Sequence, residues 1–429
     1  MQLKTTFPIL LGLAICAISI SGCLQDNCDR THTFIQFDPV YKPLEEIRTD
    51  IQVSDPRELE DPGNINYYNG YLLVNERREG VHVIDNRDPA NPVNIAFIEI
   101  PGNLDLAVKD NILYADMYLD LVAIDISDPT NASLISRRED VFSTFYPFQD
   151  NLGYVVEFIP TEVTLEVNCN EDQFGSPWFW RGGLFFANID VAFDLNTSGS
   201  AGEVGGGVGI GGSMARFTIA KDHLYTLDDW KMRVFDISQA DPVPGATIDV
   251  GWGIETLFPY GDFLFIGSNS GMFIYDNADP AQPVFLSLFQ HARACDPVFV
   301  SDDVAYVTLR DGTICEGFVN QLDIIDVSDL ANPSLIRSYG MEHPHGLSVV
   351  GETLYLCEGQ HGLKVFSVED LQRVDEQLLD HIKNIDAFDV IVLPPGDLVM
   401  MIGQDGLYQY DATDRANLVE LSVINVNRQ

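Results

Sequence analysis

Short stretches in which apolar and polar residues alternate recur along this chain from about residue 60 to its end. In the clearest unit, residues 297–300, 304–309, 321–325 and 333–338 alternate in this way, and polar turns separate them. Alternation with a period of two predicts antiparallel strands that cover one face. The unit is therefore predicted to form four successive strands.

The second strand of this unit has counterparts along the chain, each with an aliphatic or aromatic centre. Eight starts are recognisable, at Tyr71, Ile112, Gly153, His223, Phe263, Val304, Thr353 and Leu398. Their spacing of about 41 residues, apart from inserted loops, is that of a four-stranded propeller blade. The fold predicted is an all-β propeller of four-stranded antiparallel blades. Eight blades are favoured, and seven result if the third or the terminal repeat is not a full blade.

A short motif recurs at the end of one strand in each repeat. It consists of two apolar residues and Asp, followed after a short gap by Asp-Pro or a close variant. An Asp at a strand end accepts hydrogen bonds from backbone N–H groups two or three residues on, and a following Pro ends the pairing. Turn formation is favoured over metal binding because Ser367 replaces the Asp in one copy. The turn-forming residues expected are Asp85, Asp125, Asp236, Asp276, Asp326 and Asp411.

These motifs resemble the bacterial LVIVD repeat. The likeness is carried by Val-Ile-Asp at 83–85 and Ile-Ile-Asp at 324–326, and by the stretches 212–217, 291–326 and 345–349. It covers roughly residues 60–429. The resemblance implies a propeller and an exported lipoprotein, and it implies no catalytic residues.

The first 22 residues are predicted to be a lipoprotein signal peptide. Lys4 gives a positive start, and an apolar stretch too short to span a bilayer leads to Ile-Ser-Gly-Cys at 20–23, which resembles a lipobox. Cleavage before Cys23 would leave a lipidated N-terminus and linker at 23–42, followed by a single propeller domain at 43–429. Leu24 favours the outer membrane, with the periplasmic and cell-surface sides both open.

Charge limits the partners that this chain can bind. The formal net charge is −41, with 65 acidic and 24 basic residues. Nucleic acid and anionic lipid surfaces need Lys and Arg, so nucleic-acid binding is excluded. The membrane is reached through the N-terminal lipid, and the other partner is an envelope protein or a glycan. No cofactor is expected, with loosely bound calcium as the alternative.

Cysteine usage allows one disulfide to be predicted. Cys16 leaves with the signal peptide and Cys23 carries the lipid, so five cysteines remain in the mature chain. Cys295 and Cys315 flank a predicted hairpin and are expected to pair. Such a bridge would contribute about 3 kcal/mol in the chain-entropy model. The pairing of Cys28, Cys169 and Cys357 stays open.

A long insertion at about 157–213 interrupts the third repeat. It contains Trp178, Phe179, Trp180 and Arg181, followed by a glycine-rich run at 199–212. Long loops in compact domains are commonly functional or disordered. The aromatic group is a candidate platform for a sugar or ring ligand. A plug over the centre of the ring is the favoured alternative. Because no Lys and Ser/Thr follow the glycines in the required context, phosphate binding is not expected.

No catalytic or metal-binding residues are predicted. The densest polar group combines Glu342, His343 and His345 with Cys357 and His361, but no third ligand follows at a characteristic spacing. Gly-Ser-Asn-Ser-Gly at 267–271 resembles a nucleophile elbow only superficially, since it falls in a turn between strands.

The function predicted is that of a non-enzymatic cell-envelope lipoprotein. Its propeller would be a scaffold for protein or ligand binding at the outer membrane, acting through its loops. Two alternatives stay open. One is an envelope hydrolase or lyase that acts on glycans or esters in the central pocket, and the other is a cation-stabilised adhesin.

Overall fold

The computed structural model describes residues 29–142, 151–168, 208–228, 230–291, 297–310 and 319–427. The chain divides into two compact units. The first comprises Met1–Val40 and Phe158–Phe186, and the second comprises Tyr41–Glu157 and Ala187–Gln429. In the described ranges, no helix has the length and apolar character needed to cross a membrane.

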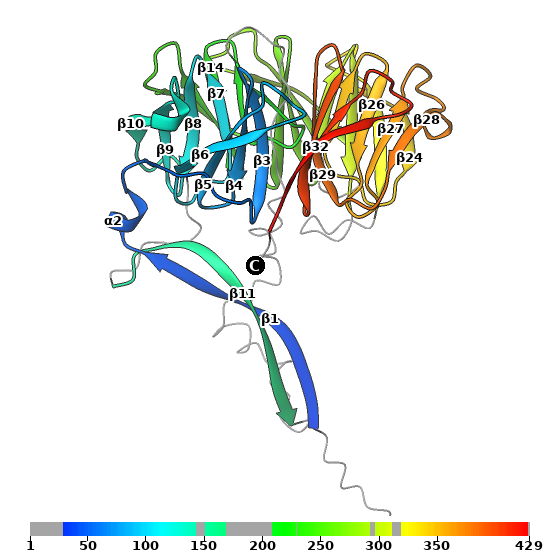
Figure 1. The fold of residues 1–429 in the computed structure, drawn as a ribbon. Helices are drawn as coiled ribbons and strands as arrows, with labels where there is room; N and C mark the ends of the chain where they lie inside the picture. The colour runs from blue at the N-terminus through cyan, green and yellow to red at the C-terminus, as the bar shows by residue number, and fades with distance from the viewer. Residues whose placement is uncertain are drawn as a thin grey trace, which may run out of the picture. The chain divides into compact units, whose positions relative to one another are not determined.

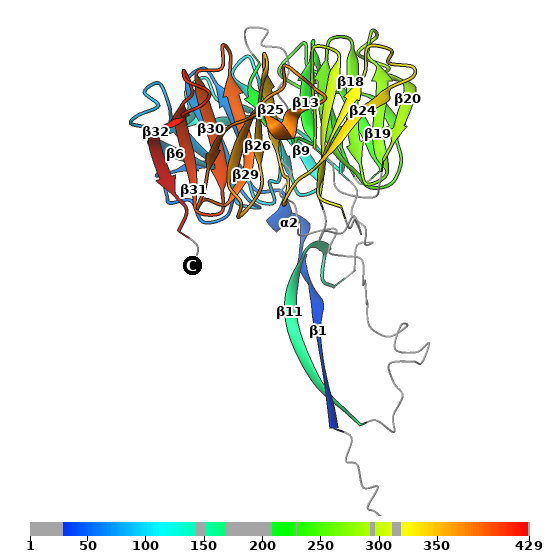
Figure 2. The ribbon, with the colours of Figure 1, turned by 90° about the vertical axis from the view of Figure 1, so that its right-hand side faces the viewer.

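The first unit contains most of a two-stranded sheet. Strand β1 (Asp29–Lys42) pairs with β11 (Tyr154–Asn168), and the Thr161 hydroxyl donates to Asp38 Oδ2 at 3.0 Å. Both strands are labelled in Figures 1 and 2. The sequence prediction counted the residues after Gly153 as a blade strand, and the structure places them in this separate sheet instead.

The second unit is a β-propeller whose described strands form seven sheets around a common axis (Figures 1 and 2). Six sheets have four strands, and one has six because two short strands are added to its edges. The predicted fold class is confirmed. The preferred number of eight blades is wrong, and the alternative of seven is right.

The first three blades are numbered in chain order. Blade 1 consists of β3 (Pro62–Tyr68), β4 (Tyr71–Glu76), β5 (Gly80–Asp85) and β6 (Val93–Glu99), with β2 (Gln52–Ser54) and β12 (Ile210–Gly211) at its edges. Blade 2 consists of β7 (Leu106–Lys109), β8 (Ile112–Met117), β9 (Asp120–Asp125) and β10 (Ser133–Arg138). Blade 3 consists of β13 (Phe217–Ala220), β14 (His223–Leu227), β15 (Lys231–Asp236) and β16 (Val243–Asp249).

The remaining four blades follow the same order. Blade 4 consists of β17 (Ile254–Tyr260), β18 (Phe263–Ser268), β19 (Gly271–Asp276) and β20 (Val284–Gln290), and blade 5 of β21 (Val298–Ser301), β22 (Val304–Leu309), β23 (Gln321–Asp326) and β24 (Ser334–Gly340). Blade 6 consists of β25 (Leu347–Val350), β26 (Thr353–Cys357), β27 (Leu363–Ser367) and β28 (Leu378–Ile382), and blade 7 of β29 (Ala387–Leu393), β30 (Leu398–Gly403), β31 (Gly406–Asp411) and β32 (Val419–Asn425). Short helical turns are α2 (Leu44–Ile47), η1 (Pro129–Asn131) and η3 (Val374–Glu376).

The pairing of the third strand with the fourth is irregular at the same place in every blade. In blade 5 the register shifts between Ile324 and Ile325, just before the turn residue Asp326, and the other six blades show the equivalent shift. A bulge increases the local right-handed twist of a strand pair. The repeated motif therefore contributes both the twist of the outer edge and the turn that follows.

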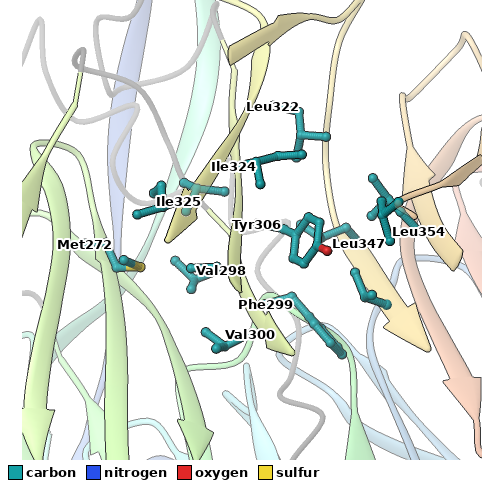
Figure 3. Packing of buried hydrophobic residues seen from close by; sticks show 14 of the residues in the cluster. Met272, Val298, Phe299, Val300, Tyr306, Leu322, Ile324, Ile325, Leu347 and Leu354 are labelled. Carbon is teal, nitrogen blue, oxygen red and sulfur yellow. The ribbon is translucent and has the colours of Figure 1, made fainter. Parts of the chain in front are cut away.

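Buried apolar side chains fill every interface between neighbouring blades. Figure 3 shows blade 5, where Val298 and Ile325 lie toward Met272 of blade 4, and Tyr306 lies toward Leu347 of blade 6. Since successive side chains of a strand point to opposite faces, each blade is apolar on both faces. The alternating pattern in the sequence reflects these two contacts.

The ring closes between blade 7 and blade 1 without exchange of a strand. Ile65 and Leu72 of blade 1 pack with Ile391 and Met400 of blade 7. The Asn427 backbone N–H then donates to the Leu59 carbonyl at 2.7 Å. In Figure 1 the blue strands of blade 1 accordingly stand next to the orange and red strands of blade 7. The four main strands of each blade are thus consecutive in the chain, and closure depends on packing together with this backbone contact.

Candidate functional site at the propeller axis

Residues 208–216, which we call the axial segment, run along the centre of the ring. Ile210 and Gly211 pair with Tyr67 and Asn66 of blade 1, and the Gly209 N–H donates to the Val108 carbonyl of blade 2 at 2.8 Å. Because β3 and β7 are the innermost strands of their blades, this part of the segment lines the axis.

The end of the axial segment reaches the opposite side of the ring. The Leu347 N–H of blade 6 donates to the Ser213 hydroxyl at 2.8 Å, and the Leu257 N–H of blade 4 donates to the Ala215 carbonyl at 2.7 Å. Ser213 and Met214 are buried. The axis, where many propellers have a channel, is here occupied at this level by the protein's own backbone.

Glycine is required in the axial segment because backbones approach closely there. A Cβ on Gly209 would overlap the Asn66 side chain, and a Cβ on Gly212 would overlap the Asp389 carboxyl group. The C-terminal end of the glycine-rich run is thus a packing feature. The candidate platform residues Trp178, Phe179, Trp180 and Arg181 lie outside the described residues, so their predicted role stays a prediction.

Asp105, directly before the innermost strand of blade 2, joins three blades. Its Oδ1 accepts from Asn64 Nδ2 of blade 1 at 2.5 Å, and its Oδ2 accepts from the backbone N–H groups of Arg216 and Phe217 at 2.7 and 2.9 Å. The Leu106 N–H also donates to Oδ1, at 2.7 Å. This buried carboxyl group fixes the point where the axial segment enters blade 3.

A second buried carboxyl group, that of Asp116, supports the same loop. Its Oδ1 accepts from the N–H groups of Leu104 and Asp105 and from Asn103 Nδ2, at 2.8 to 2.9 Å. Burial, assisted by the charge of Asp116, raises the pKa of Asp105 to about 7, although the N–H donors act against the shift. Burial also raises the pKa of Asp116. Both carboxyl groups accept hydrogen bonds from backbone N–H groups, which is typical of carboxyl groups with a structural role.

Asp389 occupies the position in blade 7 that Asp105 occupies in blade 2, directly before an apolar inner-strand residue. Its side chain is buried against Gly212 of the axial segment and Gly346 of blade 6. Burial raises the pKa of Asp389 well above its usual range, while the amides of Val390 and Ser213 act in the opposite direction. Burial thus favours the protonated, uncharged form of this side chain.

We expect the free energy of unfolding to fall as pH rises from about 5 to 7. Both carboxyl groups are ionised over this range in the unfolded chain, whereas burial raises their pKa in the folded protein, that of Asp105 to about 7, so the folded state binds more protons and loses stability as the pH rises. Urea unfolding at several pH values measures this. Asp389→Asn should flatten the dependence, and an unchanged slope in that variant would contradict the assignment.

A histidine pair lies where the connection from blade 5 enters blade 6. The buried Arg310 donates to His345 Nδ1, and His345 Nε2 lies 3.0 Å from His343 Nδ1. If Nδ1 accepts from the guanidinium, Nε2 must carry the proton and donate to His343. Burial, together with Arg310 and His343, lowers the pKa of His345 well below its usual value. This shift favours the uncharged form of His345.

The other predicted members of this polar group form ion pairs around Lys364. The ammonium group contacts the buried Glu358, and it donates to Glu342 Oε2 at 3.1 Å. His361 Nδ1 lies 3.4 Å from the same Glu342 oxygen. The lysine neutralises carboxylates that would otherwise attract a metal cation.

Cys357 is a buried free thiol at the end of β26. Burial, with Asp389 and Glu358 nearby, raises its pKa well above the usual value, so the thiol is protonated and a poor metal ligand. In the described part of the chain, no three His, Cys, Asp or Glu side chains are arranged to hold a metal ion.

The six repeat aspartates each accept the hydrogen bond of an Asx-turn. In every case Oδ1 accepts from the backbone N–H two residues on, at 2.8 to 3.2 Å. Ser367, which replaces the aspartate in blade 6, accepts the same bond through its hydroxyl at 3.4 Å. The residues concerned are Asp85, Asp125, Asp236, Asp276, Asp326 and Asp411. Cys23, Cys295 and Cys315 lie outside the described residues.

Comparison with known proteins identifies the repeat. Residues 104–140 and 292–340 match the LVIVD repeat. The chain is a β-propeller with LVIVD repeats. Each matched stretch spans one whole blade, blade 2 and blade 5, so one LVIVD repeat corresponds to one four-stranded sheet of this propeller. No curated protein sequence matches it significantly.

Solved structures similar to this chain share its propeller fold at low sequence identity. A putative 6-phosphogluconolactonase from Bacteroides fragilis is 11% identical with a TM-score of 0.53, over 85% of this chain and 96% of that one. A protein of the same description from Bacteroides uniformis is also 11% identical with a TM-score of 0.53, over 86% and 98% of the two chains. At this identity the likeness concerns the fold alone.

Proposed function

We propose that this chain is a lipid-anchored, non-enzymatic binding scaffold of the bacterial cell envelope. The observation that carries the proposal is the filled axis. The axial segment contacts the innermost strands of blades 1, 2, 4, 6 and 7, and most of its residues are buried. A ligand must then bind at the surface, on the loops between strands.

The space beside the axial segment supports this view. A cavity of about 10 Å³, lined by residues that include Asn66, Val108 and Thr218, lies next to Gly209. Such a volume holds about one water molecule, whereas pockets for small molecules have volumes of about 300 Å³ or more. Among the described residues that line it, this space is far smaller than the central pocket that the hydrolase alternative needs.

The polar side chains near the axis also favour binding over catalysis. Nδ1 of His345 accepts from Arg310, and Nδ1 of His343 faces the His345 N–H, so both lone pairs are engaged. A general base needs a free lone pair within reach of the substrate. Asp105 and Asp116 accept from backbone N–H groups, which leaves them poorly placed to exchange protons with a ligand.

Anchoring is tested by Cys23→Ser. We expect the wild-type chain to be recovered with the membrane fraction and to be labelled by an alkyne fatty acid, because Cys23 follows a lipobox-like sequence. Cys23→Ser should lose the label and leave the membrane fraction, and Cys16→Ser should keep both. Membrane recovery of unlabelled Cys23→Ser would contradict the proposal of a lipid anchor.

Partner binding is tested by a photo-crosslinking residue placed at each end of the ring. We call the end where the innermost strands begin the N-mouth. There the turns between second and third strands meet the connections between blades, as in the bond from the Asn269 N–H to the Gly253 carbonyl at 2.8 Å. His361 is an exposed position at the N-mouth, and Glu352, in the β25–β26 turn, is its exposed control at the other end. Crosslinks to an envelope component from the N-mouth alone support a scaffold, and their absence from both ends contradicts it.

A further inference from the structure

Two tryptophans outside the predicted site stack on each other at the N-mouth. Trp230 precedes β15 of blade 3, and Trp252 lies in the connection from blade 3 to blade 4. Their ring centroids are 5.9 Å apart and the planes differ by 14°. Trp252 is 57% exposed, which is unusual for so large an apolar side chain.

The backbone holds Trp252 in this outward position. Gly251 and Gly253, on either side of it, have φ values of +149° and +73°, which side chains with a Cβ rarely adopt. The N–H groups of Val250 and Gly251 donate to the Trp230 carbonyl at 3.0 and 3.3 Å. The two loops are thereby joined, and the stacked pair is fixed before any ligand arrives.

Polar groups lie beside the stacked rings. The amide of Asn269 is next to Gly253, and a Cβ on this glycine would overlap it. Ser268 holds the turn in place, because its hydroxyl accepts from the N–H groups of Ser270 and Gly271 at 3.2 and 3.1 Å. On the other side, the Lys231 ammonium lies 5.8 Å from the Trp230 ring centroid.

An exposed indole with an amide and an ammonium group beside it matches the chemistry of a sugar ring. The C–H face of a pyranose packs on an indole, and its hydroxyls bond to amides, hydroxyls and ammonium groups around the rim. Buried aromatic contacts of this kind combine a large apolar area with a fixed orientation. We propose that Trp252 and Trp230 form a binding platform for a neutral glycan.

The charge of the chain selects neutral glycans over acidic ones. At a net charge of −41, the surface repels uronic acid polymers and phosphorylated glycans as it repels other polyanions. A neutral polysaccharide is not repelled in this way, and it carries no counterions. This inference rests on the proposed binding function and names its ligand class and site.

The test is affinity electrophoresis of the detergent-solubilised full chain in gels that contain a neutral polysaccharide. Separate gels contain β-glucan, xylan, galactomannan and dextran, and alginate is the acidic control. We expect retardation in at least one neutral gel and none in alginate. Trp252→Ala should weaken that binding about tenfold or more, because a central aromatic anchor carries much of the affinity.

A matched control is Leu378→Ala, which truncates an apolar side chain of comparable exposure, 47%, on blade 6. It should bind as the wild type does. Full binding by Trp252→Ala, or no retardation in any neutral gel, overturns the platform. If the gels show no binding while N-mouth crosslinks capture an envelope protein, the glycan inference fails and the scaffold proposal stands. If the gels show no binding and the crosslinks capture no envelope component, both proposals are contradicted.

Discussion

Asp105→Asn is expected to lower the free energy of unfolding by about 3 kcal/mol at pH 8. The two oxygens of Asp105 accept from four donors, namely Asn64 Nδ2 and the N–H groups of Leu106, Arg216 and Phe217. An asparagine offers one oxygen and turns its NH₂ group toward two of these donors. Each buried donor left unsatisfied costs about 1–3 kcal/mol. Urea unfolding of the two proteins measures the loss.

Asp389→Asn is the matched control, since it makes the same replacement at the equivalent position of blade 7. Burial raises the pKa of Asp389 well above its usual range and so favours its uncharged form, which an isosteric amide resembles. We expect a change of about 1 kcal/mol or less. Equal losses in the two variants would show that Asp105 is not the acceptor that joins blades 1, 2 and 3.

Gly212→Ala is expected to cost about 3 kcal/mol, the upper range for overpacking a buried site. The new methyl group would overlap the Asp389 carboxyl group, and both residues are buried, so neither can move into solvent. The axial segment would have to shift away from blade 7. The midpoint of urea unfolding should fall accordingly.

Two variants separate this clash from a general effect of losing glycine. Gly340→Ala adds the same methyl group where no heavy atom lies within 4 Å, and we expect a change of about 0.5 kcal/mol or less. Combining Gly212→Ala with Asp389→Ala removes the overlapping carboxyl group and should recover part of the loss. If Gly212→Ala alone is as stable as Gly340→Ala, the close packing at the axis is refuted.

The strands of the propeller could be predicted because each uses a local pattern. For blade 5 the predicted segments 304–309 and 321–325 agree with Val304–Leu309 and Gln321–Asp326 to within one residue. The apolar alternation reflects packing against both neighbours, and the Asp-Pro motif marks the turn. Both signals lie within a few residues of the position they describe.

The number of blades could not be predicted with the same success. The residues after Gly153 have the apolar centre of a second strand, yet they pair with β1. An alternating apolar pattern indicates that a segment forms a strand, but it does not indicate which other strand it pairs with. The choice between seven and eight depended on contacts distant in sequence.

The residues that organise the axis also escaped the sequence analysis. Asp105 and Asp389 were two among 65 acidic residues, and only the fold shows that both are buried at equivalent positions on the inner strands of two blades. A comparison of the residue at this position in every repeat would have been the available signal. Likewise, the position of Trp252 between two glycines is a sequence signal for a connection of fixed backbone conformation that exposes an aromatic side chain.

The central claim is that residues 208–216 fill the axis of the ring, so that ligands bind on its surface. Hydrogen exchange measured by mass spectrometry tests it most directly, because buried and hydrogen-bonded amides exchange slowly. We predict that peptides covering 209–216 exchange as slowly as those covering the inner strands at 64–68 and 390–393. Exchange as fast as that of the exposed turn at 261–262 would show an open axis and contradict the account.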